Sequence, residues 1–320
     1  MSSDIRCGRV LIVGAGVMGR EYARVLQHLS IPFTLVSRGE KSAQTTSESL
    51  GMEVHSGGLD LFLRTHSSQI FDSAIVAVGI AELSGVCSTL LDAGIPSILL
   101  EKPGGATVRE IQLLADRSEK LGAMVYLAYN RRYYASVRKA RETIDQDGGV
   151  TSFHFEFTEW PSVVAPLPLS KLVKENWFLA NSTHVVDLAF YLGGKPRTLS
   201  SYHAGTLHWH PVAARFVGAG ITELGALFSY CANWEAPGRW GVEIMTRAHR
   251  LILRPLEKLQ SSSHGSVAVV PVDIEDDDDL RFKPGLLSEV NDFLNQAENL
   301  PTIQDQVANI ALYSQICPLA

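Results

Sequence analysis

The first part of the chain alternates between short apolar runs and longer segments whose apolar residues recur at helical spacing. The short runs have the continuous apolarity of strands that a parallel sheet buries on both faces. We expect these strands at 10–13, 31–36, 74–78, 98–100 and 124–128. We expect the intervening helices at 20–29, 81–93 and 108–121. Such repeated strand–helix units predict a doubly wound parallel sheet that is complete by about residue 129.

Two glycines and a capping signal sharpen these boundaries. Gly94 and Gly122 follow the second and third helical segments, as glycine commonly does where a helix ends. Thr107 and Glu110 have the spacing of a capping box, so the helix after Thr107 is expected to begin at Val108.

The pattern changes after residue 129. From Thr151 to Glu159 the residues alternate strictly, with Phe153, Phe155 and Phe157 on one face and His154, Glu156 and Thr158 on the other. Alternation of this kind is typical of an antiparallel sheet with unlike faces. Further strands are expected at 197–208, 224–234, 240–246, 250–253 and 266–272, and helices at 134–145, 182–193, 286–299 and 303–316. We interpret the acidic run 276–279 as a solvated loop rather than a metal site.

These patterns predict two domains in an α/β protein. Residues 1–129 form a domain with the doubly wound parallel sheet of a Rossmann fold, and residues 130–320 form an α+β domain with a large, mostly antiparallel open sheet.

Composition narrows the class of protein. The chain has 320 residues, of which 46% are hydrophobic and 19% charged, as in a globular protein of two domains. The net charge of −6 argues against a nucleic acid as the main partner. The four cysteines (Cys7, Cys87, Cys231 and Cys317) have no metal-ligand spacing, so no metal site is expected. We expect a cytoplasmic protein with reduced thiols, since Met1–Asp4 lacks the start of a signal peptide and no apolar stretch would span a membrane.

A glycine-rich turn follows the first strand directly. Gly14, Gly16 and Gly19 form a GxGxxG pattern, with Ala15, Val17 and Met18 between them, and a helical segment follows. Gly14 permits a tight turn, Gly16 lets the backbone approach a pyrophosphate, and Gly19 allows close packing. The helix N-terminus then offers unpaired N–H groups to the phosphates. Between a strand and a helix this pattern is strong evidence for dinucleotide binding.

The end of the second strand bears on the choice of dinucleotide. An NAD site usually places an acid there, whereas this chain has Ser37 and Arg38. An arginine can form two hydrogen bonds to a phosphate, and a serine can donate to it. We therefore predict a preference for NADP(H), with NAD(H) possible because Glu40 lies close enough in sequence to reach the ribose. Residues at the ends of the next strands are also expected at the cofactor: Val78, Gly79, Glu101 and Lys102.

Lys102 is the first catalytic candidate. It follows the strand that ends near Leu100, and Pro103 biases its backbone toward an extended conformation. Ligands in open α/β sheets bind at the carboxyl ends of strands, so the ammonium group would face the substrate. A lysine at a strand end is otherwise an ordinary loop residue.

His184 is the second candidate. Asn181 or Ser182 can cap a helix that ends at Gly193 and Gly194, which puts His184 in its first turn. The helix dipole there favours a neutral, proton-accepting imidazole. A histidine at a helix start is commonly a packing residue, but beside a dinucleotide fold it becomes an acid–base candidate.

Four motifs together carry a family resemblance: Gly14–Gly19, Glu101–Pro103, Asn130–Arg132 and His184–Asp187. In order and spacing the chain resembles the glucose–fructose oxidoreductase / inositol dehydrogenase (Gfo/Idh/MocA) family over nearly its whole length. The resemblance implies a hydride transfer between a nicotinamide and a secondary alcohol or ketone of a sugar, cyclitol or nucleotide-linked sugar. It also implies a homodimer or homotetramer formed through the sheet of the second domain, whose His154, Glu156 and Thr158 face would be free.

Under this resemblance Lys102 would hydrogen-bond the reacting oxygen and His184 would move the proton. Candidate substrate-lining residues are Tyr129, Asn130, Arg131, Lys174, Trp177 and Asn181. The chain departs from the family at Ala180, where many members have an aspartate four residues before the histidine. Asn181, Glu175 or Asp187 would then orient His184.

Two alternatives stay open. The first is a dinucleotide-sensing regulator of the same fold without turnover, although such a protein would need neither Lys102 nor His184. The second is an imine reductase or a dihydrodiol-type dehydrogenase on this fold.

Overall fold

The computed structural model describes residues 8–295 and 297–319, and the chain forms two compact units. The first unit contains the chain up to Tyr129 together with Leu286–Asn309, and the second contains Asn130–Gly285 and the chain from Ile310 onward. The first segment therefore ends where the sequence places the domain boundary. The expectation that all of 130–320 forms one domain is wrong, because Leu286–Asn309 belongs to the first unit. Met1–Asp4 and Cys7 lie outside the described residues.

The first unit contains the predicted parallel sheet. Its strands are β1 (Val10–Val13), β2 (Phe33–Val36), β3 (Ser73–Val76), β4 (Ser97–Glu101) and β5 (Met124–Ala128). All pair in parallel, in the order β2-β1-β3-β4-β5. The order reverses between β1 and β3, and in open α/β sheets ligands bind beside such a reversal at the carboxyl ends of the strands.

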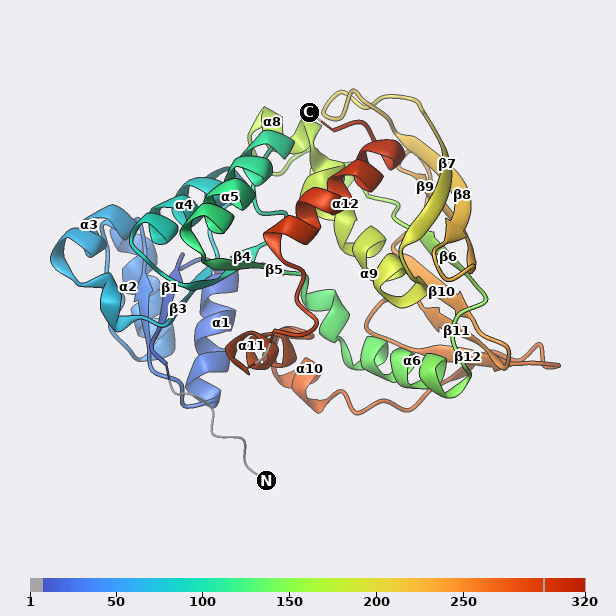
Figure 1. Cartoon of the computed structure of the whole chain (residues 1–320), viewed down its shortest axis with the longest axis horizontal. Helices are drawn as coiled ribbons and strands as arrows, with labels where there is room; N and C mark the ends of the chain where they lie inside the picture. The colour runs from blue at the N-terminus through green and yellow to red at the C-terminus, as the bar shows by residue number, and fades with distance from the viewer. Residues whose placement is uncertain (1–7, 296, 320) are drawn as a thin grey trace. The chain divides into compact units, whose positions relative to one another are not determined.

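Helices cover both faces of this sheet (Figure 1). They are α1 (Val17–His28), α2 (Glu40–Leu50), α3 (Gly58–Thr65), α4 (Leu83–Asp92), α5 (Val108–Leu121), α11 (Leu286–Asn295) and the first residues of α12 (Ile303–Ile316). The predicted start of α5 is confirmed, since the Thr107 side chain accepts a hydrogen bond from the Glu110 N–H at 3.3 Å. The sequence interpretation did not include α2 and α3, and the expected helix 81–93 is preceded by a separate 3₁₀ turn, Ile80–Glu82.

The second unit contains an eight-stranded sheet in the order β13-β12-β11-β10-β6-β9-β8-β7. Its strands are β6 (Ser152–Glu156), β7 (Pro196–Ala204), β8 (Arg215–Thr222), β9 (Leu227–Asn233), β10 (Gly241–Met245), β11 (His249–Leu253), β12 (Gln260–Ser263) and β13 (Val270–Pro271). All neighbours pair antiparallel except β6 and β9, which are parallel. The expected strand 266–272 is reduced to β13, and β8 and β12 were not predicted.

Two glycines explain why the sequence pattern did not predict β8. Gly218 and Gly220 interrupt its apolar alternation, yet both are required by the partner strand. A Cβ atom at Gly218 would lie 2.5 Å from the Tyr230 ring, and one at Gly220 would lie 2.6 Å from the Phe228 ring. The missing side chains therefore make room for aromatic rings of β9.

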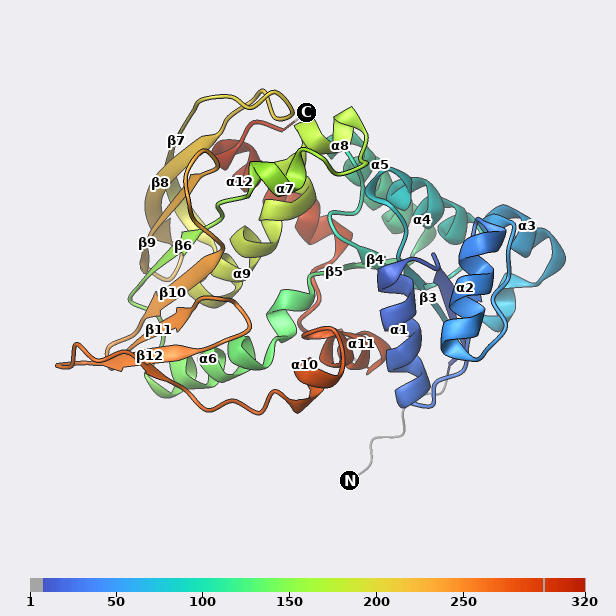
Figure 2. The same cartoon turned by 180° about the vertical axis from the view of Figure 1, so that it is seen from behind.

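Two helices of the second unit, α6 (Ala135–Gln146) and α9 (Thr183–Gly193), pack against its sheet (Figures 1 and 2). The unit also contains α7 (Pro161–Val164), α8 (Lys171–Glu175), a π-helical turn (Phe178–Ser182) and α10 (Asp277–Arg281). The interpretation of 276–279 as a loop is wrong, because most of this acidic run lies in α10. The Asp279 carboxylate accepts hydrogen bonds from the backbone N–H groups of Ala135 and Gly285, both at 2.8 Å, which anchors the short helix.

The predicted phenylalanine face is the core of the second unit. Phe153, Phe155 and Phe157 are fully buried, and the first two contact Phe190 of α9 edge to face. On the opposite face His154 and Glu156 are half-buried. Thr158 is an exception to the expected free face, because it lies beyond the end of β6, is buried, and accepts a hydrogen bond from the Asn233 N–H.

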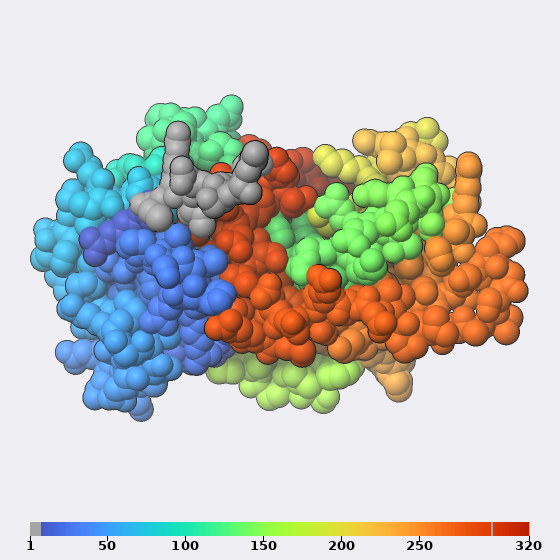
Figure 3. Space-filling view, turned by 90° about the horizontal axis from the view of Figure 1, so that it is seen from below, coloured from blue at the N-terminus to red at the C-terminus, as the bar shows by residue number. Residues whose placement is uncertain are grey.

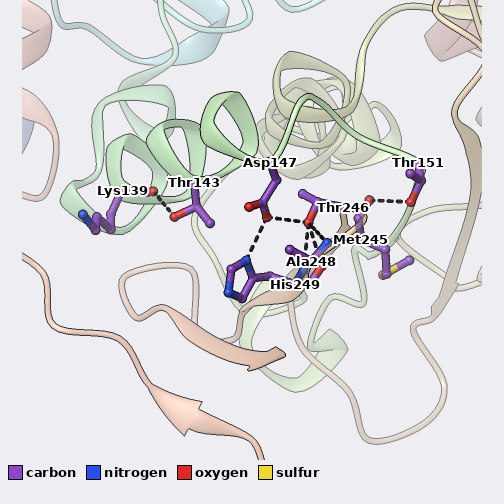
Figure 4. A network of polar contacts seen from close by, with 8 residues as sticks. All are labelled: Lys139, Thr143, Asp147, Thr151, Met245, Thr246, Ala248 and His249. Atoms are coloured by element: carbon purple, nitrogen blue, oxygen red, sulfur yellow. Dashed lines mark hydrogen bonds and ion pairs between the residues drawn. The ribbon is translucent and has the colours of Figure 1, made fainter. Parts of the chain in front are cut away.

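Helix α6 is fastened to the β10–β11 hairpin by a polar network (Figure 4). The Asp147 carboxylate accepts hydrogen bonds from the Thr246 hydroxyl at 2.6 Å and from His249 at 2.8 Å. These bonds hold the pKa of Asp147 below its ordinary value. In the space-filling view the green residues of α6 accordingly lie beside orange residues of this part of the sheet (Figure 3).

Candidate functional site

The turn between β1 and α1 has the geometry that its glycines predict. Gly14 has a φ of 113°, and a Cβ atom there would lie 2.3 Å from the Ala77 carbonyl oxygen. A Cβ atom at Gly19 would lie 1.7 Å from the Gly14 carbonyl oxygen, so α1 packs directly on the turn. A Cβ atom at Gly16 would meet nothing within 4 Å. The backbone at Gly16 is therefore open to a ligand.

A cavity of about 820 Å³ lies at this turn and at the carboxyl ends of β1, β2 and β3. Of the predicted cofactor residues, those that line it are Gly14, Gly16, Ser37, Arg38, Val78 and Gly79. Those that do not line it are Val17, Met18, Gly19, Glu101 and Lys102. Both its position beside the strand-order reversal and its size suit a dinucleotide.

The charged side chains around this cavity are Arg38, Asp60 and Glu82. Arg38 extends from the end of β2 and forms an ion pair with Glu82, which lies at the end of the 3₁₀ turn before α4. Both partners are exposed, with 80% and 42% of their side-chain surface accessible. The cation expected to meet a ribose phosphate is thus already held by a carboxylate.

The backbone around Ser37 is fixed by a segment that the sequence interpretation did not include. The Ser37 N–H donates to the His55 carbonyl at 2.7 Å, and the Gly58 N–H donates to the Ser37 carbonyl at 2.9 Å. The Ser37 hydroxyl donates to the Gly39 carbonyl at 3.1 Å. Gly57 and Gly58 both have positive φ, and this glycine pair was the available sequence signal for a turn at the cavity.

The end of β4 carries Glu101 and the half-buried Lys102. Glu101 accepts a hydrogen bond from the Tyr22 hydroxyl at 3.0 Å, and that hydroxyl lies 3.4 Å from a carboxylate oxygen of Glu289 on α11. Burial, together with the two carboxylates, raises the pKa of Tyr22 well above its ordinary value. The strand end that presents Lys102 is therefore held to α1 by a partly buried hydrogen bond.

In the second unit, His184 is the second residue of α9 and is buried. A π-helical turn leads straight into α9, and the Ser182 side chain forms no cap. The expectation of a freshly capped helix start is therefore wrong, and with it the simple dipole argument for a neutral imidazole. The His184 ring lies 6.2 Å from the ring of Trp240, measured between centroids.

Glu159 is the site residue that sequence reasoning missed. Its carboxylate accepts hydrogen bonds from Asn181 at 3.0 and 3.1 Å and from the Ser182 hydroxyl at 2.8 Å, and these two residues precede His184 with only Thr183 between. Burial raises the pKa of Glu159, although these hydrogen bonds oppose the shift. Position 159 continues the alternation of Phe153, Phe155 and Phe157, so an acid on the buried face was the available signal.

The three residues proposed to orient His184 interact with other side chains. Asn181 donates to Glu159, and Glu175 forms an ion pair with Lys171 at 3.6 Å. The Asp187 carboxylate accepts two hydrogen bonds from Arg132, at 2.7 and 2.5 Å. Burial lowers the pKa of Arg132, but its bonds to Asp187 outweigh this effect and the net shift is upward.

The structure gives the remaining substrate candidates different surroundings. Tyr129 is fully buried, with its hydroxyl donating to Gln306 at 3.1 Å. Asn130 donates to the Pro284 carbonyl, and Lys174 donates to the Ala165 carbonyl at 2.7 Å. Trp177 is buried and meets Trp209 edge to face. Arg131, by contrast, stacks on Trp240, so it lies in the same cluster as His184.

Among residues 8–295 and 297–319, no group of three or more His, Cys, Asp or Glu side chains could hold a metal ion. Cys87, Cys231 and Cys317 form no disulfide. Within the same described part of the chain, no helix combines the length and apolarity needed to cross a membrane.

Comparison with known proteins gives one sequence match and several structural ones. Residues 8–129 match the profile of an oxidoreductase family with an NAD-binding Rossmann fold. The chain has no significant match among curated protein sequences.

Three solved structures illustrate the structural matches. Levoglucosan dehydrogenase in complex with NADH has a TM-score of 0.76 and 18% identity, over 97% of this chain and 95% of that one. UDP-N-acetylglucosamine 3-dehydrogenase from Acidithiobacillus ferrooxidans has a TM-score of 0.73 and 16% identity, over 96% of both chains. An Agrobacterium radiobacter oxidoreductase in complex with NAD⁺, L-tartaric acid and magnesium has a TM-score of 0.74 and 10% identity, over 96% and 94%. At these identities the likeness establishes the fold.

Proposed function

We propose, since residues 8–129 match the model of the Gfo/Idh/MocA oxidoreductase family, that this protein is an NAD(P)-dependent dehydrogenase or reductase. Its substrate would be a secondary alcohol or ketone of a sugar, a cyclitol or a nucleotide-linked sugar. The observation that carries the proposal is the cavity of about 820 Å³ at the glycine turn, beside the reversal of strand order. The sugar dehydrogenases among the structural neighbours support this substrate class.

Different residues of the cavity would contact different parts of the cofactor. The open backbone at Gly16 and the N-terminus of α1 would hold the pyrophosphate. Arg38 and the backbone at Ser37 lie where the adenosine ribose is expected in this fold. We retain the preference for NADP(H) as part of the proposal, with the added requirement that Arg38 exchange Glu82 for the 2′-phosphate.

The nicotinamide, when bound, accepts or supplies the hydride, so the protein has to orient the substrate and handle one proton. Lys102 would donate a hydrogen bond to the reacting oxygen and offset the negative charge that develops on it. His184 would exchange the proton of that oxygen. Glu159 would act through Asn181 and Ser182 as a positioning residue for the helix start that carries His184.

The exposed face of the second unit's sheet supports a further part of the proposal, a homodimer or homotetramer. Tyr202 and Val217 lie on this face with 70% and 53% of their surface exposed. They line a hollow of about 500 Å³ together with Glu156 and Cys231. Light scattering at micromolar concentration tests this association, and a strictly monomeric mass contradicts it.

Two measurements on the full chain test the proposed function. The first is a fluorescence titration with NADPH and NADH, in which at least one cofactor should bind at micromolar concentration. The second is a screen of sugars, cyclitols and nucleotide-linked sugars for oxidation or reduction of the bound cofactor, compared with the Lys102→Met variant. Lys120→Met, an exposed lysine on α5, is the matched control. A chain that binds the cofactor and turns over none of these classes would be a sensor or an imine or dihydrodiol reductase instead.

A further inference from the structure

Two arginine side chains of the second unit stack on one buried indole ring. The guanidinium carbons of Arg131 and Arg239 lie 4.9 and 4.8 Å from the ring centroid of Trp240. Arg239 also lies 4.7 Å from the centroid of Trp160, so one guanidinium contacts two indoles. Stacking of this kind holds a guanidinium in place and leaves its N–H edges to form hydrogen bonds, of which Arg131 makes one, to the Asn130 side-chain oxygen at 3.2 Å.

The charge of these two arginines is not balanced by an ion pair within the described chain. No carboxylate oxygen lies within 4.0 Å of the Arg131 or Arg239 guanidinium in residues 8–295 and 297–319, whereas the neighbouring Arg132 is paired with Asp187. Glu159 is attracted to Arg239, but its oxygens accept hydrogen bonds from Asn181 and Ser182. The pair therefore forms a local centre of positive charge.

The indole N–H of Trp240 points to the same conclusion independently. Trp240 is 5% exposed, and its Nε1 atom is buried without a hydrogen-bond partner among the described residues. An indole nitrogen can only donate. A buried donor left unsatisfied costs about 1–3 kcal/mol, so its presence here indicates an acceptor that the protein itself does not provide.

The position of this cluster ties it to the candidate chemistry. The same Trp240 ring lies 6.2 Å from the ring of His184. Because both guanidinium carbons are within 5 Å of one ring centroid, they lie at most about 10 Å apart. One oxyanion group bound by both would take the two guanidinium edges and the indole N–H together.

We propose that Arg131, Arg239 and Trp240 form a subsite for a negatively charged substituent of the substrate, a carboxylate or a phosphoryl group. The inference rests on the proposed function, since it assigns the carbohydrate an anionic group near His184. It narrows the substrate class from neutral sugars and cyclitols to uronates, sugar phosphates and their nucleotide-linked derivatives. Hydrogen bonds from Arg to such anions are short, charge-assisted and about twice as strong as neutral ones.

Calorimetric titration of the NADPH-loaded full chain tests this subsite with three probes: D-glucuronate, D-glucose 1-phosphate and D-glucose. At least one anionic probe should bind at least tenfold more tightly than glucose, and the stronger of the two identifies carboxylate or phosphoryl recognition. Raising the salt concentration should weaken that binding and leave glucose unchanged.

Three variants locate the effect. Arg131→Gln and Arg239→Gln should each weaken the anionic probe about tenfold or more, because each removes a charge but keeps most of the stem. Trp240→Phe keeps a ring for stacking and removes only the N–H donor, so it should cause a smaller loss. The control is Arg197→Gln, an exposed arginine on β7, and it should have no effect. Unchanged melting temperatures would show that the variants fold.

Three results would overturn the subsite. Glucose could bind as tightly as both anions, neither anion could bind, or the affinity for the anions could be the same in Arg131→Gln and Arg239→Gln as in the unsubstituted chain. The fluorescence titration with NADPH separates this failure from that of the proposed function. A chain that binds NADPH but shows no anion preference loses only the subsite. A chain that binds neither nicotinamide cofactor loses the proposed function.

Discussion

The Arg38–Glu82 ion pair makes cofactor preference a competition that substitution can shift. Both side chains are exposed, and exposed ion pairs contribute about 0.2–1 kcal/mol. A charge-assisted contact between Arg38 and a 2′-phosphate would contribute about 1.5–3 kcal/mol. The phosphate should therefore displace Glu82, with a net gain of roughly 1–2 kcal/mol for NADPH.

Fluorescence titration with both cofactors measures this competition. Arg38→Ala should weaken NADPH binding by roughly tenfold and leave NADH nearly unchanged, since 1.4 kcal/mol corresponds to a factor of ten. Glu82→Gln frees Arg38 in advance and should strengthen NADPH binding by up to about fivefold. Glu119→Gln, an exposed acid on α5, is the matched control. Equal weakening of NADPH and NADH by Arg38→Ala, or weaker NADPH binding in Glu82→Gln, would refute the reasoning.

Four further substitutions test the site and the fold. In steady-state assays, Lys102→Met and His184→Ala should each lower kcat by about 10²–10⁴-fold with NADPH affinity retained, and normal turnover in both would place the chemistry elsewhere. The pKa of Glu159 is raised by burial, so the folded chain holds its proton more tightly than the unfolded chain does. The protonated Glu159 therefore adds to the free energy of unfolding at pH values below its pKa in the unfolded chain. This contribution is lost as the pH rises through its pKa in the folded chain. Denaturant titrations across mildly acidic pH measure the free energy of unfolding, and in Glu159→Gln this free energy should fall less steeply as the pH rises. An unchanged dependence of the free energy of unfolding on pH would contradict the assignment. Gly218→Ala should cost about 1–3 kcal/mol, seen as a lower Tm, because its Cβ would lie 2.5 Å from the Tyr230 ring, whereas Gly85→Ala, with open space around it, should not.

The periodic signals predicted the elements that they govern directly. Short apolar runs gave the five parallel strands, and β5 and α12 have the predicted bounds. The glycines at positions 14, 16 and 19 gave the turn geometry, because each role depends on local backbone contacts. The helix cap at Thr107 could likewise be predicted, because its hydrogen bond joins residues that are close in sequence.

The errors arose where a residue's partner is distant in sequence. An amphipathic helix shows that it buries a face but not what it packs against, so α11 was assigned to the wrong unit although it packs on α1. Gly218 and Gly220 looked like breaks in a strand because the rings that need their space belong to β9. The pairing of Arg38 with Glu82 joins residues 44 positions apart, and no local pattern signals it.

The return of Leu286–Asn309 to the first unit places residues 130–285 between two segments of that unit, and the chain from Ile310 onward belongs again to the second unit. A fragment that stops at Tyr129 would lack the segment that lies along β5, where the Leu127 N–H donates to the Pro301 carbonyl at 2.8 Å. It would expose the edge of β5 to pairing with other chains and leave Tyr129 without Gln306. A fragment that joins residues 8–129 to 286–309 through a short linker keeps both the segment along β5 and the hydrogen bond between Tyr129 and Gln306. The fragment to express on its own is therefore discontinuous in sequence.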